Sequence, residues 1–333
     1  MIAPAPPASL LVRSPNWLGD AVLSLPAVAS LKRWLGKGPI TVASSQKLSA
    51  LWRLCPFVDR LIELTHPERL FSTARQLREG GFEAALLLPN SPRSALEARF
   101  AGIRTVWGKA AWPRSALLSR PRLLGRPADH IPQQAAIYLA LVQELGVSGS
   151  MALPELRIPA SWLERPEPVI AFCPGAEYGP AKRWPPEFYI ALARRLRAST
   201  GYEVRLYGAA GDREVCERIA SELPGVESLA GRTTLEEFLA ALARSRLVVC
   251  NDSGAMHVAA LLGVPVVALF GSTDPARTGP LGSSTRILSH PVPCGPCFRR
   301  TCPTDLACLR RIDPEAVYAV CLEQLGSSAA VSS

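Results

Sequence analysis

A glycine-rich segment in the second half of the chain has the residue types of an anion-binding loop. Its sequence over residues 173–185, Cys-Pro-Gly-Ala-Glu-Tyr-Gly-Pro-Ala-Lys-Arg-Trp-Pro, follows an apolar run over 169–173 and precedes a helical pattern over 187–197. Such a loop can turn backbone N–H groups toward a phosphate, and Lys182 would neutralise that phosphate as a point charge. The glycine spacing matches neither the dinucleotide fingerprint nor a Walker loop, and a plain surface loop is the alternative.

A second motif, Asn-Asp-Ser-Gly-Ala-Met-His over residues 251–257, follows an apolar run and opens another helical pattern. At such a helix start, the N–H groups of Ser253 and Gly254 would face an anion. His257 comes four residues after Ser253 and shares its helix face. Asp252 would cap the helix or orient a ligand hydroxyl. A histidine after a strand is more often structural, but beside this helix start we expect it to face a phosphate.

Asp20 is the candidate for acid–base chemistry, at the end of the segment Asn-Trp-Leu-Gly-Asp over residues 16–20. It lies just after the first apolar run of the chain. A carboxylate there can remove the proton of a hydroxyl nucleophile as a general base. The alternative role is that of a helix cap, because aspartate favours helix N-termini.

Two further segments suit either chemistry or plainer roles. Residues 271–279 form a polar stretch bounded by glycines, which suits sugar contacts or a simple connection. The spacing C-x2-C-x4-C-x5-C joins Cys294, Cys297, Cys302 and Cys308. Four thiolates this close can bind zinc or an iron–sulfur cluster, can form disulfides, or can stay free. The spacing matches neither common zinc pattern, and we expect no metal site.

Short apolar runs alternate with helical patterns around all of these motifs. Strands are predicted over 10–13, 40–43, 84–88, 169–173, 203–207, 247–250 and 266–270. Helices are predicted over 21–34, 187–197, 213–223, 234–245, 255–262 and 314–325. The strands lack polar alternation, as expected for a parallel sheet covered on both faces. The pattern predicts an α/β protein of two doubly wound units, with a ligand cleft at the carboxyl ends of their strands.

The chain of 333 residues is long enough for two domains, and a proline-rich stretch without periodicity separates its halves. We predict a Rossmann-like domain over residues 1–155, a linker over 156–168, a second Rossmann-like domain over 169–325 and a tail over 326–333. No apolar run is long enough to span a membrane, and no basic region precedes the first apolar stretch. We therefore expect a cytoplasmic protein.

The formal net charge of +9 is confined to the first half of the chain. Residues 1–165 carry 20 Lys/Arg and 11 Asp/Glu, whereas residues 166–333 carry 17 of each. Residues 93–126 contain eight Lys or Arg residues and a single acidic residue. A basic face attracts polyanions, and a solvated surface is the alternative. Because no zinc-finger, RNA-binding or helix-turn-helix signature accompanies the charge, an anionic lipid surface or acidic glycolipid fits better than nucleic acid.

Together these motifs resemble the ADP-heptose–lipopolysaccharide heptosyltransferases, from about residue 10 to residue 325. The Asp-Ser-Gly-x-x-His motif marks the wider family, and the motifs over 173–185 and 294–308 are specific for the heptosyltransferase II subgroup. The resemblance implies a GT-B fold whose first domain binds acceptor and whose second binds nucleotide sugar. It implies inverting transfer of L-glycero-D-manno-heptose from ADP-heptose to the first heptose on Kdo–lipid A. It also implies no cofactor and a peripheral location at the inner membrane.

The resemblance assigns roles to individual residues. The general base falls on Asp20. Donor binding falls on Lys182 for the diphosphate, on Asp252, Ser253, Gly254 and His257 at the helix start, and on Thr233 and Glu214 for the nucleoside. Acceptor binding is expected of polar and basic residues in the first domain, namely Asn16, Arg93, Arg99 and Arg120. Gly-Pro-Ala stands where the family usually has Thr or Ser before the lysine, so backbone contacts are expected in that loop.

Two other functions are compatible with the same residues. One is a heptosyltransferase I, or a related GT-B transferase with another donor; donor and acceptor screening separates these. The other is a non-enzymatic nucleotide- or polyanion-binding protein, which would bind ligand without turnover. A nicotinamide-dependent oxidoreductase fits less well, because the dinucleotide fingerprint is missing.

Overall fold

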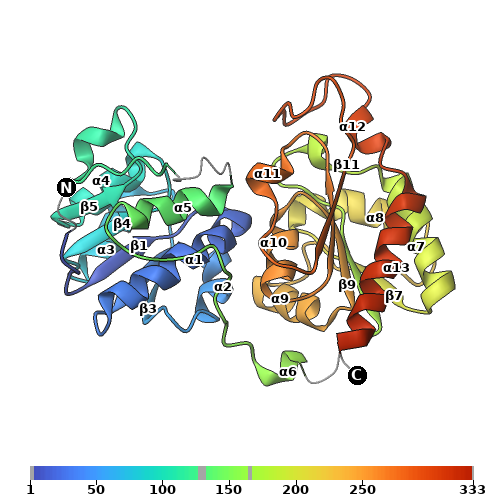
Figure 1. Cartoon of the computed structure of the whole chain (residues 1–333), viewed down its shortest axis with the longest axis horizontal. Helices are drawn as coiled ribbons and strands as arrows, with labels where there is room; N and C mark the ends of the chain where they lie inside the picture. Colours follow the sequence, from blue (N-terminus) through green and yellow to red (C-terminus); the bar gives the residue numbers. More distant parts are fainter. Residues whose placement is uncertain (1–3, 127–132, 164–166, 332–333) are drawn as a thin grey trace. The chain divides into compact units, whose positions relative to one another are not determined.

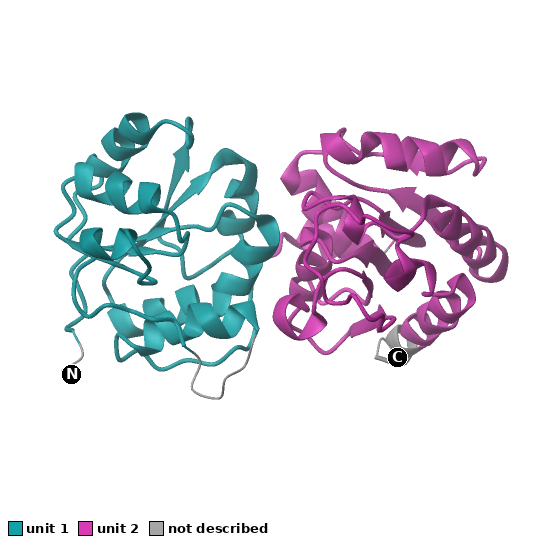
Figure 2. Cartoon of the chain, turned by 90° about the horizontal axis from the view of Figure 1, so that it is seen from above, with its two compact units in different colours: residues 1–157 teal, residues 158–333 magenta. Residues whose placement is uncertain are grey.

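The computed structural model describes residues 4–126, 133–163 and 167–331, with side chains described as far as residue 326. The chain divides into two compact units, Met1–Arg157 and Ile158–Ser333, which Figure 2 colours separately. The division falls inside the proline-rich stretch. Each unit is described by itself below.

Unit 1 is built around a five-stranded parallel sheet with the strand order β3-β2-β1-β4-β5. Its strands are β1 (Leu10–Arg13), β2 (Ile40–Ser45), β3 (Arg60–Leu64), β4 (Ala84–Leu87) and β5 (Thr105–Gly108). Its helices are α1 (Leu18–Leu35), α2 (Ser49–Arg53), α3 (Leu70–Arg78), α4 (Pro92–Phe100) and α5 (Gln134–Gln143), with the 3-10 turns η1 (Gln46–Leu48) and η2 (Arg114–Leu117).

Helices cover both faces of this sheet, α1 with α5 on one face and α3 with α4 on the other (Figure 1). The central strand β1 is buried over its whole length, which its apolar sequence Leu-Leu-Val requires. Arg13, its last residue, pairs with Ala43 of β2 and Leu87 of β4. Because all strands are parallel, the segments that follow them meet at one edge of the sheet.

Unit 2 has a six-stranded parallel sheet with the order β11-β10-β9-β6-β7-β8. Its strands are β6 (Val169–Cys173), β7 (Glu203–Leu206), β8 (Glu227–Ser228), β9 (Leu247–Asn251), β10 (Val266–Phe270) and β11 (Thr285–Ser289). Its helices are α6 (Ala160–Leu163), α7 (Pro186–Thr200), α8 (Arg213–Ser221), α9 (Leu235–Arg244), α10 (Gly254–Leu261), α11 (Pro275–Thr278), α12 (Ala307–Arg310) and α13 (Pro314–Val331), with the 3-10 turns η3 (Pro180–Lys182) and η4 (Ala210–Asp212).

In this unit α9 and α10 lie on one side of the sheet, and α7, α8 and α13 lie on the other (Figure 1). Strands β6 and β9 are neighbours, with Cys173 beside Cys250. The loop that leaves β6 therefore meets the loop that leaves β9. The long C-terminal helix α13 packs on α7 and stays with unit 2.

All seven predicted strands are present, and 10–13, 169–173 and 266–270 have the predicted bounds. The sequence analysis did not find β3, β5, β8 and β11. Strand β3 is mostly half-buried and β11 is largely exposed, and both carry polar residues. Strand β8 has two residues. None of these three therefore forms a buried apolar run. Within the described residues, none of the helices combines the length and apolar character that crossing a membrane requires.

Candidate functional site

Lys182 and Asp252 form a buried ion pair in unit 2. Lys182 donates from Nζ to Oδ2 of Asp252 at 2.6 Å, and both side chains are at least nine-tenths buried. Lys182 ends η3 after β6, and Asp252 follows β9, so the neighbouring parallel strands bring the two motifs together. The hydroxyls of Thr273 and Thr278 also donate to Oδ2 of Asp252. A positive group is thus fixed at the edge of the sheet where the strands end.

The start of α10 lies directly beside this pair. Ser253 is the N-cap residue and Gly254 the first helical residue; Ser253 makes no side-chain cap hydrogen bond. Because the first N–H groups of a helix lack partners within it, they can bind an anion. His257 is buried, and burial lowers its pKa to about 4 despite the nearby Asp252. The imidazole is therefore neutral at pH 7, and its Nδ1 has no hydrogen-bond partner among the described residues.

The loop that carries Lys182 is also attached to the cysteine-rich segment near the C-terminus. The Ala181 N–H donates to the Arg300 carbonyl at 3.0 Å, and the Tyr178 hydroxyl donates to the Phe298 carbonyl at 2.6 Å. Gly179 has a φ of +152°, and a Cβ there would lie 2.4 Å from the Arg300 carbonyl oxygen. Only glycine therefore permits this close approach of the two backbones.

The two predicted nucleoside residues lie on other segments of unit 2. Thr233 is half-buried and directly precedes Thr234, which caps α9 through a reciprocal pair of bonds with Glu237. Glu214 is exposed in the first turn of α8 and lines a pocket together with Arg183 and Arg218. The nucleoside roles of Thr233 and Glu214 stay predictions.

Asp20 is the third residue of α1, where a negative charge is favourable beside the helix N-terminus. Trp17 holds the N-cap position, so Asp20 is not the cap of this helix. Its carboxylate is half-buried and accepts a hydrogen bond from the phenol of Tyr138 in α5. Burial first, and then the charge of Asp20, raise the pKa of Tyr138, so the phenol stays a hydrogen-bond donor. Asn16 is exposed in the segment before α1.

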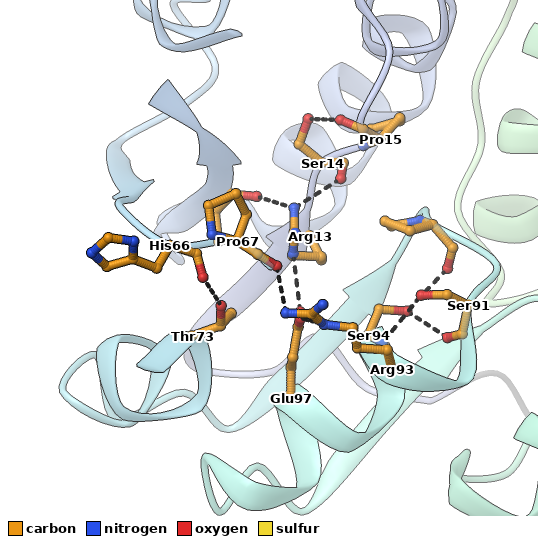
Figure 3. A network of polar contacts seen from close by, with 12 residues as sticks. Arg13, Ser14, Pro15, His66, Pro67, Thr73, Ser91, Arg93, Ser94 and Glu97 are labelled. Carbon is orange, nitrogen blue, oxygen red and sulfur yellow. Dashed lines mark hydrogen bonds and ion pairs between the residues drawn. The ribbon is translucent and has the colours of Figure 1, made fainter. Parts of the chain in front are cut away.

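A network of charged side chains holds the backbone just before this segment (Figure 3). Arg13, at the end of β1, is buried and donates from Nε to Glu97 in α4 at 3.4 Å. Its Nη1 donates to the carbonyls of Ser14 and Ala43. Arg93 donates to the other carboxylate oxygen of Glu97 at 3.0 Å. We call Arg13, Glu97 and Arg93 the charged network. It connects β1, β2 and α4 at the end of β1, just before the segment that leads to Asp20.

The predicted acceptor residues differ in how much of each guanidinium is free. Arg93 is 39% exposed but is bound to Glu97 and to the Pro67 carbonyl. Arg99 donates to the carbonyls of residues 103, 104 and 117 and to Ser119. Arg120 is exposed. Arg114, one of the eight cations expected on a basic face, is buried and its pKa is lowered to about 10 by burial, so that expectation was wrong for this residue.

The four clustered cysteines are free thiols. Cys308 is buried, and burial raises its pKa, with smaller contributions from its three neighbours in the motif. Cys302 is near Thr304, whose hydrogen bonds lower the pKa of this thiol. Among the described residues, no group of three or more His, Cys, Asp and Glu side chains has a geometry that could hold a metal ion.

The sequence analysis missed three kinds of residue at these two sites. Thr273 lies in the polar stretch that was expected to contact sugar, but its hydroxyl binds Asp252. Arg13 is a cation at the end of an apolar strand, an unusual pairing that could have drawn attention to it. Tyr138 gave no local signal, because its partner Asp20 lies in another helix far along the chain. Glu97 lies four residues after Arg93, but that spacing gives no sign of its second partner, Arg13, which is 84 positions away.

Comparisons with known proteins show the family to which the chain is similar. A family model described as glycosyltransferase family 9 (heptosyltransferase) matches residues 70–307. The chain is 34% identical over 311 residues to lipopolysaccharide heptosyltransferase 2 of Salmonella typhimurium, covering 84% of this chain and 87% of that protein. It is 37% identical over 142 residues to lipopolysaccharide heptosyltransferase 1 of Pseudomonas aeruginosa, covering only 41% and 39% of the two chains.

The structure is similar to that of ADP-heptose LPS heptosyltransferase II of E. coli. The TM-score is 0.84 at 31% identity, and the match covers 96% of this chain and 99% of that one. The predicted α/β, GT-B fold class is thereby confirmed. The shared cleft expected between the two units stays a prediction, as do the roles of the individual residues.

Proposed function

Because this chain belongs to glycosyltransferase family 9, the heptosyltransferases, we propose that it adds the second heptose of the lipopolysaccharide inner core. The donor is ADP-heptose and the acceptor is the first heptose on Kdo–lipid A. Similarity to heptosyltransferases 2 extends over most of the chain, whereas the heptosyltransferase 1 of Pseudomonas aeruginosa matches less than half of it. The buried Lys182–Asp252 pair beside the start of α10 is the structural observation that carries the donor assignment.

In the proposed reaction, Asp20 accepts the proton of an acceptor hydroxyl as the oxygen attacks the anomeric carbon of the donor. The new glycosidic C–O bond forms while the bond from that carbon to the diphosphate breaks, and ADP leaves with the electron pair. Attack from the face opposite the leaving group inverts the anomeric configuration. A half-buried carboxylate in the first turn of α1 can perform this proton transfer.

Lys182 and the first N–H groups of α10 would stabilise the charge that develops on the departing diphosphate. Asp252 would hold the lysine in place through the hydrogen bond between the two side chains. His257 is neutral and would act as a hydrogen-bond donor or acceptor, with no charge of its own. We propose that these groups suffice without a metal ion or other cofactor.

The acceptor would bind to unit 1, which carries the excess positive charge of the chain. Exposed Arg120 and the exposed part of Arg93 can meet carboxylates of Kdo and phosphates of lipid A. The same charge would favour peripheral contact of the enzyme with the anionic inner face of the cytoplasmic membrane. Nucleic acid is not a proposed partner.

The decisive experiment incubates the purified protein with ADP-heptose and a heptosyl-Kdo–lipid A acceptor, and mass spectrometry then measures the product. One added heptose is expected, also in the presence of EDTA. Transfer only to an acceptor that lacks the first heptose would instead indicate a heptosyltransferase I. Binding of ADP-heptose without any transfer to either acceptor would contradict the proposed activity.

A further inference from the structure

We propose that Asn251 is a positioning residue that holds the Lys182 loop, residues 174–185, in the arrangement that receives the donor diphosphate. The inference rests on the proposed function, because it concerns the same donor site. Asn251 is the last residue of β9 and immediately precedes Asp252. Its side chain is fully buried, so it acts through the loop and does not touch the donor itself.

Three hydrogen bonds connect the Asn251 side chain to the two ends of this loop, and a fourth connects it to Tyr189 in α7, the helix that follows. Its Nδ2 donates to the carbonyls of Pro174 at 2.7 Å and Gly175 at 3.3 Å, where the loop begins. Its Oδ1 accepts from the Trp184 N–H at 3.0 Å, where the loop ends. Oδ1 also accepts from the Tyr189 hydroxyl at 3.1 Å. One side chain therefore fixes the separation between the two ends of the loop.

Only a side-chain amide of this length satisfies these partners. The loop start offers two carbonyl oxygens, which need donors. The Trp184 N–H at the loop end and the Tyr189 hydroxyl of α7 are two donors, which need an acceptor. An aspartate would face the Pro174 carbonyl with a second acceptor, and a smaller apolar residue would leave all four groups buried without partners. Both changes carry a penalty, because unsatisfied buried polar groups are costly.

We call Asn251 with its four hydrogen bonds the clamp. The position of Asn251 in the chain links the clamp to the amine of Lys182. Consecutive residues, Asn251 and Asp252, bind the backbone of the loop and the amine of Lys182 respectively. Trp184 lies two residues after Lys182, and its indole donates to the Ile312 carbonyl at 3.1 Å. A change in the spacing at Asn251 would therefore move Lys182 relative to the start of α10.

The test compares ADP binding by Asn251→Asp and wild-type protein, using calorimetry at pH 8 and pH 6. At pH 8 the variant should bind ADP about 10–100-fold more weakly, because two buried hydrogen bonds are lost and a carboxylate opposes the carbonyls. At pH 6 binding should recover in part, because burial favours the protonated acid, which can donate to Pro174 again. ADP affinity equal to wild type at both pH values would overturn the proposal.

A control separates positioning from general loss of stability. Leu223→Ala removes a buried side chain from the hydrophobic core that also contains Trp184 and Tyr189. It makes no change at the loop. It should lower the melting temperature but keep wild-type ADP affinity. If it weakens ADP binding as much as Asn251→Asp does at equal melting temperature, the effect is general destabilisation and the proposal fails.

Tyr189→Phe provides a milder version of the test, should Asn251→Asp not fold. It removes one of the two donors to Oδ1 and should weaken ADP binding about two- to tenfold; unchanged affinity would count against the clamp. Wild-type protein that binds ADP but transfers no heptose would refute the proposed function while leaving the clamp measurable. Wild-type transfer with unaffected variants would refute the clamp alone.

Discussion

The two units hold their candidate functional groups with different chemistry. In unit 1 the backbone before Asp20 is held by the charged network, in which Arg13 and Arg93 share Glu97. In unit 2 the two ends of the loop that carries Lys182 are held by the uncharged amide of Asn251, and Arg183 within the loop pairs with Asp212. Both supporting groups, Arg13 of the charged network and Asn251, which we call braces, lie at the end of a central strand, β1 in unit 1 and β9 in unit 2.

The difference matches the charge of the group that each brace supports. Lys182 and Asp252 are themselves buried charges, and another ion beside them would alter the field at the phosphate site. A neutral amide fixes the loop without that effect. In unit 1 Arg13 and Glu97 are buried, whereas Asp20, seven residues after Arg13, is half-buried. Buried ions hold well as a set, but the loss of one leaves another uncompensated.

The largest expected effect is the loss of turnover when the proposed general base, Asp20, is replaced. Asp20→Asn should lower turnover about 10²–10⁴-fold, because a positioned general base is lost. ADP affinity should be unchanged, because the donor site lies in unit 2, and asparagine keeps an oxygen that can accept from Tyr138. Steady-state kinetics and calorimetry test this, with the exposed Glu79→Gln as control. Near-normal turnover would remove Asp20 from the mechanism.

The next effect concerns the stability of the charged network. Glu97→Gln should lower the free energy of unfolding by about 3–5 kcal/mol, because Arg13 stays buried without a counter-ion. The control Glu63→Gln breaks the exposed pair with Arg53 and should cost less than about 1 kcal/mol. Urea unfolding followed by circular dichroism measures both. Equal losses would show that the charged network is no stronger than a surface pair.

The next effect is a loss of ADP affinity when the amine in unit 2 is removed. Lys182→Ala should weaken ADP binding about 10–100-fold, the range expected for a lost hydrogen bond to a charged group. The matched control is Arg286→Ala, an exposed cation on the edge strand of the same unit. Calorimetry measures the ADP affinity of both variants. If they bind ADP with equal affinity, Lys182 does not contact the diphosphate.

The smallest effect is a pH dependence that arises in unit 2. Burial lowers the pKa of His257 from 6.5 to about 4, so the unfolded chain binds an extra proton between these values. Stability is therefore complete above pH 6.5 and falls as the pH drops toward 4. The loss should be about 1 kcal/mol between pH 7.5 and pH 5.5. His257→Gln should abolish this part of the dependence, whereas the exposed His66→Gln should retain it.

The sequence was sufficient for the features that depend on neighbouring residues. A short apolar run such as 169–173 predicts a strand that is buried on both faces, and this prediction does not depend on which strands lie beside it. The motifs of Lys182 and Asp252 were recognisable because a strand, a loop and a helix start follow one another in the chain. Edge strands such as β11 were not predictable, because they contain polar and exposed residues and no buried apolar run.

Only the tertiary structure decided which of these residues meet. Lys182 reaches Asp252 across 70 positions because β6 and β9 are neighbours, and the apolar pattern does not specify strand order. Arg13 reaches Glu97 across 84 positions for the same kind of reason. Asn251 opens the motif over residues 251–257, but the motif does not reveal what its side chain binds, and its role follows from four partners that the fold brings to one buried amide. Spacing along the chain determines local conformation, whereas hydrogen-bond partners at strand ends depend on the order of strands in the sheet.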